Sequence, residues 1–322
     1  MPSTPAIETI GLAKRFNSFT AVNDLTFKVS EGEVFGLLGP NGAGKTTTIR
    51  MLACLIPPSN GSASVAGYDI AKDASKVREN VGVLTENPSL YERLTAYENM
   101  EFFAQAYGLT DQSKRNVRIR ELLEFFDLWS RRSDRVVTFS KGIKQKLAIA
   151  RALIHNPHII FLDEPTAGLD PESAKSIRDL VERLSQQEKH TFLLCTHRLE
   201  DAERLCSRMI IINKGRGVAV GTIEELRNRV ERGHVIEIAL KEVDRKVVET
   251  VKRLNHILNV DTNCSSGLMR ISVEDHDSVT PEVVRSVVNA GGQVLSVNVL
   301  RPSLEEAYLK LVKKEEGRGQ LV

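Results

Sequence analysis

Apolar and polar positions alternate along parts of this chain and form unbroken runs in others, and each pattern predicts a different element. Leu25, Phe27 and Val29 alternate with polar residues, which predicts half-buried antiparallel strands in the N-terminal part. Apolar runs predict further strands at Val34–Leu38, Val81–Leu84, His158–Asp163, Thr191–Thr196 and Arg208–Asn213. Unbroken runs of this kind are typical of strands buried on both faces. We therefore expect an α/β fold with a mostly parallel sheet and a smaller set of N-terminal antiparallel strands.

The middle of the chain has the spacing of helices instead. Thr95 and Glu98 have the spacing of a capping box, which starts one helix. Another helix begins at Ser140 and carries its apolar residues on one face. Because this block interrupts the alternation of strands and helices, we expect residues 92–157 to form a helical subdomain.

The C-terminal part has a pattern of its own, in the order strand, helix, strand, strand, helix, strand. The predicted elements are Val235–Leu240, Val243–Ile257, Leu258–Thr262, Leu268–Val273, Val279–Ala290 and Gln293–Leu300. This order is typical of a ferredoxin-like domain. We expect one domain over residues 1–232, a small α+β accessory domain over 233–312, and a charged tail over 313–322 that is disordered. The accessory domain shows no catalytic constellation, and we interpret it as regulatory or dimer-supporting.

The composition agrees with two globular domains. The chain has 322 residues, of which 41% are hydrophobic and 27% charged, and single cores rarely grow beyond about 250 to 300 residues. A net charge of +2 gives no general field for nucleic acid. The basic clusters at 114–120 and 131–135 lack interleaved aromatic residues for base stacking, so no nucleic-acid partner is expected.

Cysteines and apolar runs argue against several other classes of protein. The cysteines stand singly, at positions 54, 195, 206 and 264, which favours neither a zinc site nor a disulfide framework. The N-terminal residues lack the basic-then-apolar pattern of a signal sequence, and no apolar run approaches the roughly 18 residues that span a bilayer. Any work on a membrane would therefore need a partner.

The most specific motif is a glycine-rich loop between an apolar strand and a helix. Its residues are Gly39, Pro40, Asn41, Gly42, Ala43, Gly44, Lys45, Thr46 and Thr47. The pattern G-x-x-x-x-G-K-[ST] predicts a nucleoside triphosphate site, because backbone N–H groups can wrap closely round phosphate where side chains are absent. The Lys45 ammonium would reach the β- and γ-phosphates, and the Thr46 hydroxyl would ligate magnesium. Thr47 would donate to an α-phosphate oxygen.

Two acids follow a later apolar strand, at the sheet edge where open α/β folds place their ligand-handling groups. Asp163 would hold magnesium through water, and Glu164 would be the base that orients and deprotonates the attacking water. The alternative is an exposed acidic turn. His197 ends another apolar strand and could reach a γ-phosphate, although a lone histidine is more often structural. Phe16 lies in a loop-like setting, and its spacing alone favours a satellite core residue.

Four further motifs accompany the glycine-rich loop. They are FSKGIKQKL at Phe139–Leu147, IIFLDEP at Ile159–Pro165, AGLD at Ala167–Asp170, and the pair Thr196-His197. With this set, in this order and spacing, the region 6–232 resembles the nucleotide-binding subunit of an ABC transporter. The resemblance implies ATP and Mg²⁺ as ligands.

The resemblance also implies a role for each matching residue. It assigns Phe16 to stacking on the adenine, Gly39–Thr47 to the phosphates, Asp163 to Mg²⁺, Glu164 to the catalytic base, Asp170 to a dimer contact and His197 to the γ-phosphate. For Phe16 this reverses the preference for a core residue.

Ser140 and Gly142 match the family signature, whose helix N-terminus faces the γ-phosphate of the ATP bound by the other subunit. Anion capture at a capped helix end is physically sensible there. One chain carries one copy of each motif. The resemblance therefore implies that two copies, or this chain and a paralogous subunit, pair head-to-tail to complete two sites.

The chain departs from the family pattern at three positions. Glu86 stands where the family usually has the glutamine that senses magnesium and touches the membrane subunit. A carboxylate can still ligate the metal, but it adds a negative charge near the phosphates. Lys141 and Ile143 replace a glycine and the glutamine of the signature, which leaves the contacts to the ribose open. These variants and the appended C-terminal domain resemble the exporter branch that includes sodium-extrusion and daunorubicin-type drug-resistance ATPases.

The resemblance implies an ATPase that powers a separate integral membrane permease, for export, from the cytoplasmic face of the cell membrane as a peripheral subunit. The alternative is a soluble ABC-type ATPase that acts on a macromolecular complex such as the ribosome or DNA. Such proteins typically carry two ATPase units or a long coiled-coil insertion, and this sequence has neither. A GTPase is disfavoured because Arg216 stands where the guanine-reading N-K-x-D motif needs an acid.

Overall fold

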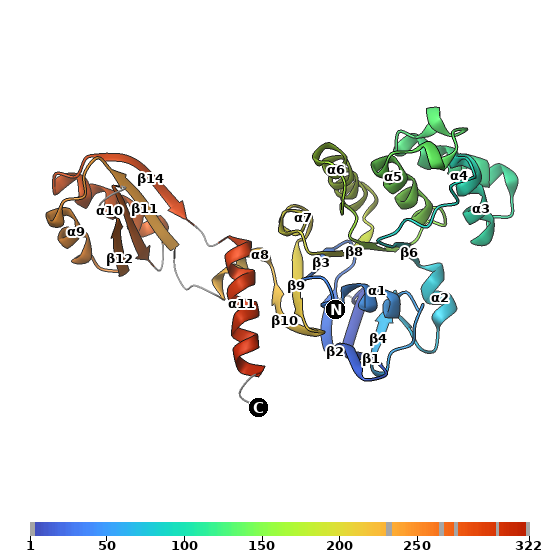
Figure 1. Ribbon diagram of the computed structural model, residues 1–322, viewed down its shortest axis with the longest axis horizontal. Helices are drawn as coiled ribbons and strands as arrows, with labels where there is room; N and C mark the ends of the chain where they lie inside the picture. The colour runs from blue at the N-terminus through green and yellow to red at the C-terminus, as the bar shows by residue number, and fades with distance from the viewer. Residues whose placement is uncertain (1–3, 230–233, 264–266, 274–275, 301–302, 320–322) are drawn as a thin grey trace. The chain divides into compact units, whose positions relative to one another are not determined.

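The computed structural model describes residues 4–229, 234–263, 267–273, 276–300 and 303–319 (Figure 1). The chain forms two compact units, Met1–Thr222 and Ile223–Val322. The division falls earlier than the predicted boundary between 232 and 233, which lies outside the described residues. Helix α8 (Ile223–Asn228) belongs to the second unit because it packs against α11 (Leu304–Gly319).

The first unit contains two sheets. The antiparallel sheet has the order β2-β1-β4-β5, from β1 (Ile7–Phe16), β2 (Phe19–Val29), β4 (Asn60–Val65) and β5 (Tyr68–Asp69). The second sheet has the order β10-β9-β3-β8-β7-β6, from β3 (Val34–Leu38), β6 (Val81–Leu84), β7 (Ile159–Asp163), β8 (Thr191–Thr196), β9 (Arg208–Asn213) and β10 (Arg216–Gly221). Its strands pair in parallel except β9 with β10. The predicted α/β fold with a mostly parallel sheet and N-terminal antiparallel strands is confirmed.

Helix α1 (Lys45–Leu52) joins the two sheets, because it contacts β2 and β4 of one and β7 and β8 of the other. The resulting core combines buried apolar side chains of both sheets with those of the helix. Phe27 of β2 and Phe35 of β3 stack with ring centroids 5.4 Å apart. Helix α7 (Leu199–Leu205) packs on β3 and β8, and α6 (Pro171–Glu188) packs on α7. Figure 1 shows α6 and α7 on the sheet face opposite α1.

The helical subdomain consists of α3 (Ala96–Ala106), α4 (Gln112–Phe125) and α5 (Lys141–Ala152), with short 3₁₀ turns at Trp129–Arg131 and Val136–Thr138 between them. These helices lie together in green at the upper right of Figure 1, above α2 (Ala74–Glu79) in this view. The predicted capping box is present, since the Thr95 hydroxyl accepts from the Glu98 backbone and the Glu98 carboxylate accepts from the Thr95 backbone. The predicted start of a helix at Ser140 is also confirmed.

The second unit has the predicted ferredoxin-like order of elements. They are β11 (His234–Leu240), α9 (Arg245–Lys252), β12 (Ile257–Asn263), β13 (Leu268–Val273), α10 (His276–Asn289) and β14 (Val294–Leu300). The sheet order is β12-β13-β11-β14, with antiparallel pairing throughout the described strands. Buried valines of both helices pack on one face of this sheet.

Two predictions for the second unit are wrong. The helix predicted at Val243–Ile257 ends at Lys252, because Ile257 already pairs with Val273 at the start of β12. The tail predicted to be disordered from residue 313 is helical to Gly319, and its last residues, 320–322, lie outside the described chain. The capping contacts between Ser303 and Glu306 start this helix, and residues of high helix propensity continue it. No helix among the described residues is long and apolar enough to cross a membrane.

Candidate functional site

The glycine-rich loop lies at the carboxyl end of β3 and leads directly into α1, which begins at Lys45, so the predicted order of strand, loop and helix is confirmed. In the sheet, β3 neighbours β8, and β8 neighbours β7. These strands run parallel, so the residues that follow them meet at one edge of the sheet. The topology thereby brings together the loop after Leu38, the acids after Leu162 and the histidine after Thr196.

The glycines of the loop serve two different purposes. A Cβ at Gly44, whose φ is +105°, would lie 2.5 Å from the Ala21 carbonyl oxygen. A Cβ at Gly39 would collide with the Ile212 carbonyl oxygen. These two glycines therefore let the loop pack onto the protein's own backbone. A Cβ at Gly42 would meet no protein atom within 4 Å, but its φ of +78° still favours glycine.

Lys45 is buried at the start of α1 and directs its ammonium back across the loop. Its Nζ donates to the carbonyl oxygens of Gly39, at 2.8 Å, and Pro40, at 3.2 Å. It also lies 3.3 Å from Glu164 Oε1, and both side chains are more than nine-tenths buried. The cation is thus held at the mouth of the loop, where the motif requires it to meet phosphate.

Asp163 is the last residue of β7 and is 1% exposed. Burial raises the pKa of its carboxyl group, the Thr46 hydroxyl bond lowers that pKa, and the charges of Glu164 and Glu86 raise it. Its Oδ1 atom is buried and has no hydrogen-bond partner among the described residues. This buried carboxylate has an oxygen without a partner and is hydrogen-bonded to Thr46, so the two side chains together could hold a metal ion.

Glu164 is placed by an unusual backbone conformation. Its φ is +53°, in the left-handed region that residues with a side chain rarely adopt. The Glu164 N–H donates to the Cys195 carbonyl oxygen at 2.9 Å, which ties this turn to β8. The carboxylate lies between two nitrogen-bearing side chains, since Oε2 is 2.9 Å from His197 Nδ1 and Oε1 is 3.3 Å from Lys45 Nζ. Among the predicted catalytic residues, Glu164 therefore contacts both Lys45 and His197.

A pocket of about 320 Å³ opens over the loop. It is lined by Phe19, Ala21, Asn41, Gly42, Gly44, Lys45, Thr46, Thr47, Glu86, Glu164, Ala167 and His197. Glu86 is exposed and lies close enough to Asp163 to raise the pKa of that carboxyl. The position predicted to sense magnesium therefore lines the same pocket as the glycine-rich loop and Glu164.

The aromatic side of the pocket differs from the sequence interpretation. Phe16 does not line the pocket: it ends β1, pairs with Phe19 across the hairpin, and is 46% exposed. The Lys14 ammonium lies 5.1 Å from the centroid of the Phe16 ring. The loop-like setting expected for Phe16 is wrong, and its exposure argues against a core residue. Phe19, which the sequence analysis did not select, lines the pocket, and its position three residues after Phe16 was the only signal.

The remaining predicted residues lie away from this pocket. Ser140 caps α5 by accepting from the Ile143 N–H at 3.4 Å, and it is exposed. A Cβ at Gly142 would lie 2.6 Å from Ser173 Oγ, so this glycine allows α5 to approach α6. Asp170 caps α6 by accepting from the Ser173 N–H at 2.9 Å. One chain therefore does not bring its own signature residues to its own glycine-rich loop.

The donors available for a metal are oxygen atoms. No cluster of three or more His, Cys, Asp and Glu side chains suited to a metal ion occurs within the described part of the chain. Thr46 and Glu86 line the pocket, and the buried Asp163 carboxylate lies behind them, hydrogen-bonded to Thr46. Magnesium prefers such donors and is commonly held by one or two protein groups together with substrate phosphates. The residues present fit this ion.

Sequence profiles and relatives agree with this geometry. The ABC transporter profile matches residues 22–167, and a profile for the C-terminal domain of DrrA1-3-like ATP-binding proteins matches residues 221–312. The linearmycin resistance ATP-binding protein LnrL of Bacillus subtilis is 33% identical over 95% of this chain and 97% of its own length. The daunorubicin resistance ATP-binding protein DrrA3 of Streptomyces coeruleorubidus is 35% identical, with 95% of both chains covered.

The chain belongs to the ATP-binding subunits of ABC transporters. A solved relative is the ATP-binding cassette MJ0796, described as a dimer in a post-hydrolysis state bound to ADP and Pi. Its TM-score with this structure is 0.62, with 26% identity over 67% of this chain and 98% of the cassette. This ABC subunit is therefore an ATPase, and its resemblance to the drug-resistance branch is confirmed.

Proposed function

We propose that this ABC subunit hydrolyses ATP in a head-to-tail pair and thereby powers a separate membrane permease that exports its substrate. The contact of Glu164 with both Lys45 and His197 at the phosphate loop carries the proposal, because it joins a base, a phosphate-binding cation and a histidine in one pocket. The names of the resistance proteins LnrL and DrrA3, which match nearly the whole chain, support the outward direction.

Efflux tests the proposed function directly. Cells that express this chain together with the membrane permease that co-purifies with it should lose preloaded daunorubicin, the drug named for the relative DrrA3, faster than cells that express the Lys45→Ala chain with the same permease. If the two strains lose the drug at the same rate while the purified chain hydrolyses ATP, the proposed export is wrong for a drug of this kind and the ATPase assignment stands.

Within the pair, we assign the roles that the pocket supports. Backbone N–H groups of the loop bind the phosphates, Lys45 neutralises their charge, and Thr47 donates to the α-phosphate. Thr46, Asp163 and Glu86 would hold Mg²⁺, which when bound neutralises the charge of the β- and γ-phosphates. Glu164 orients the attacking water and accepts its proton, and His197 contacts the γ-phosphate.

Glu86 makes ATP affinity depend on magnesium, and the Glu86→Gln variant tests this. Without the metal, its carboxylate meets triphosphate across a partly desolvated pocket, where like charges about 4 Å apart cost on the order of 1 to 4 kcal/mol. The variant should therefore bind ATP more tightly in EDTA, while its affinity for Mg-ATP changes much less. Equilibrium titration of ATP with and without magnesium measures both affinities.

Glu79→Gln is the matched control, because it removes the same charge from α2, outside this pocket. Its affinity for ATP should not change under either condition. Equal shifts for Glu86→Gln with and without magnesium would show that Glu86 does not face the metal and instead serves the membrane partner.

Phe16 is proposed as the adenine platform, and the neighbouring Phe19 provides the comparison. Stacking of a base on an aromatic ring contributes about 1 to 3 kcal/mol. Phe16→Ala should therefore raise the Kd of ATP by roughly tenfold or more, and Phe19→Ala should raise it less. Fluorescence titration with a labelled ATP analogue measures both constants. A larger loss in Phe19→Ala would move the adenine contact to the residue that lines the pocket.

A further inference from the structure

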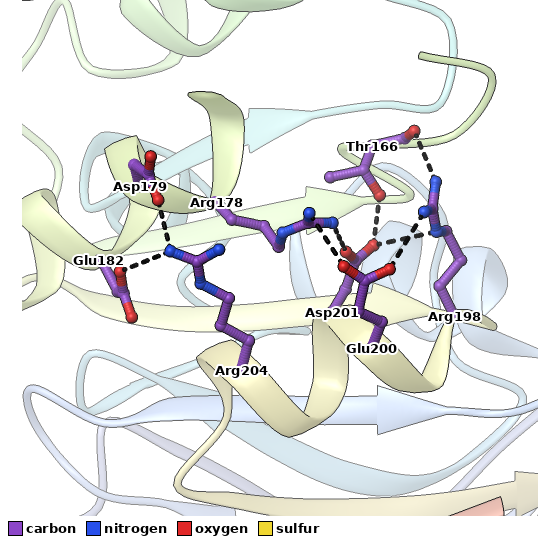
Figure 2. Close-up of polar contacts among 8 residues, drawn as sticks. All are labelled: Thr166, Arg178, Asp179, Glu182, Arg198, Glu200, Asp201 and Arg204. Carbon is purple, nitrogen blue, oxygen red and sulfur yellow. Dashed lines mark hydrogen bonds and ion pairs between the residues drawn. The ribbon is translucent and has the colours of Figure 1, made fainter. Parts of the chain in front are cut away.

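A cluster of charged and polar side chains with a buried centre lies between α6 and α7, and the ATP site described above makes no use of it (Figure 2). We call it the Asp201 cluster; its members are Thr166, Arg178, Arg198, Glu200 and Asp201. Asp201 is 0% exposed, Thr166 1% and Arg178 5%. Charges this deeply buried are costly unless they are paired and hydrogen-bonded, so removal of one partner of Asp201 should disturb the others.

Asp201 is the centre of the cluster. Its Oδ1 accepts a hydrogen bond of 2.9 Å from Arg178 Nη1, and its Oδ2 accepts a short hydrogen bond from the Thr166 hydroxyl. Arg198 Nε lies 3.7 Å from the same Oδ2. Glu200 adds a second anion, 3.0 Å from Arg178 and 3.6 Å from Arg198. Figure 2 shows both arginines directed at the two acids of α7.

The cluster holds the two loops that carry Glu164 and His197. Thr166 lies two residues after Glu164, and Arg198 directly follows His197. The Arg198 guanidinium also reaches the Thr166 carbonyl oxygen, with 3.4 Å between Nη1 and that oxygen. The loop after β7 and the loop after β8 are therefore linked to each other and to one buried carboxylate.

Backbone contacts extend this link to the site itself. The Arg198 N–H donates to the Thr196 hydroxyl at 3.0 Å, which fixes the turn that contains His197. Glu164 holds a left-handed backbone with a φ of +53°, a conformation that persists only when its surroundings enforce it. The 2.9 Å contact between the His197 ring and the Glu164 carboxylate therefore depends on the conformations of the turn after β7 and the turn after β8.

We propose that Asp201 is a positioning residue for ATP hydrolysis. It acts through Thr166 and Arg198 to hold the Glu164 carboxylate and the His197 ring in contact with each other. This inference rests on the proposed function and adds residues to it that touch neither ATP nor metal. Displacement of a catalytic group by about 1 Å can cost on the order of 10²-fold in rate. The phosphate loop makes none of the contacts described for the cluster, so loosening the cluster should slow turnover without weakening ATP binding.

Thr166→Val tests the proposal because it removes the hydroxyl that Asp201 accepts from and keeps the shape of the side chain. Its kcat should fall about tenfold or more, whereas the Kd of ATP from equilibrium binding should change less than twofold. Thr166→Ser keeps the hydroxyl and should restore most of kcat. Arg198→Met removes the other link from a partly exposed position, so it should fold and show the same loss of kcat.

Arg204→Met is the matched control. Arg204 joins the same two helices through Asp179 and Glu182, but it contacts neither Thr166 nor Arg198 among the interactions drawn in Figure 2. Its kcat should stay at the wild-type value even if its melting temperature falls. Melting temperatures of all variants separate loss of positioning from loss of folding.

Three results would overturn the inference. They are wild-type kcat in both Thr166→Val and Arg198→Met, equal losses of kcat in these variants and in Arg204→Met, and a loss of ATP affinity that parallels the loss of kcat. Wild-type turnover is measured first. If the wild-type chain does not hydrolyse Mg-ATP, the proposed function fails and the inference fails with it, whereas active wild-type enzyme with unaffected variants contradicts the inference alone.

Discussion

Glu164→Gln is expected to bind ATP as the wild-type chain does, to lose turnover by roughly 10²-fold or more, and to accumulate as an ATP-bound dimer. The amide keeps the size of the side chain but cannot accept the proton of the attacking water. It also removes the negative charge that lies 3.3 Å from Lys45 and 2.9 Å from His197. Because the loop that binds the phosphates is unchanged, binding should survive while hydrolysis stops.

Steady-state phosphate release and size-exclusion chromatography with Mg-ATP measure the two consequences. Glu121→Gln, an exposed change in α4, is the control for loss of one negative charge and should behave as the wild type. Residue 164 must adopt the same left-handed backbone conformation whether it is glutamate or glutamine, so the variant should fold. Turnover at the wild-type rate in Glu164→Gln would remove Glu164 from the mechanism.

The sequence predicted which residues meet at the candidate site, because each of them directly follows an apolar strand. The phosphate loop follows β3, Asp163 and Glu164 follow β7, and His197 follows β8, and in each case an apolar run marked the strand. Parallel strands place their carboxyl ends at one edge of a sheet, so the sequence alone was enough to predict that these residues lie close together. The contacts of Glu164 with Lys45 and with His197 are the result.

Side-chain directions at an exposed hairpin were not predictable in the same way. Phe16 and Phe19 are both exposed aromatics at the ends of paired strands, the pairing is irregular near Arg15, and only Phe19 of the two lines the pocket. No apolar periodicity reports such irregularities. The helical residues after 312 were missed for a related reason, because a run of charged residues has no apolar face although lysine and glutamate favour helices.

The Asp201 cluster was missed because its members come from separate parts of the chain. Thr166, Arg178 and Asp201 meet only when α6 packs against α7, and no local motif contains them. One signal was available in the sequence. Asp201 lies beside Ala202 on the buried side of α7, and an acid at such a position requires a buried partner.

The largest effect expected for the whole assembly is complementation between two inactive chains. Ser140 is exposed at the start of α5 and does not line its own chain's pocket, whereas Lys45 does. In a head-to-tail pair, each site would combine the phosphate loop of one chain with the signature of the other. Lys45→Ala alone and Ser140→Arg alone should therefore each leave both sites defective, and neither should dimerise with ATP.

A mixture of the two variants should regain ATP-driven dimers, because a mixed pair contains one site in which both halves are wild type. Loss of the Ser140 cap costs only about 1 kcal/mol, so the arginine acts by blocking the site and not by unfolding α5. Light scattering of the mixture with Mg-ATP, against each parent alone, measures the gain. Lys45→Ala mixed with Asp163→Asn is the control, since both changes lie on the phosphate-loop side and no mixed pair has an intact site. A Lys45→Ala and Ser140→Arg mixture that never exceeds its parents would contradict the head-to-tail arrangement.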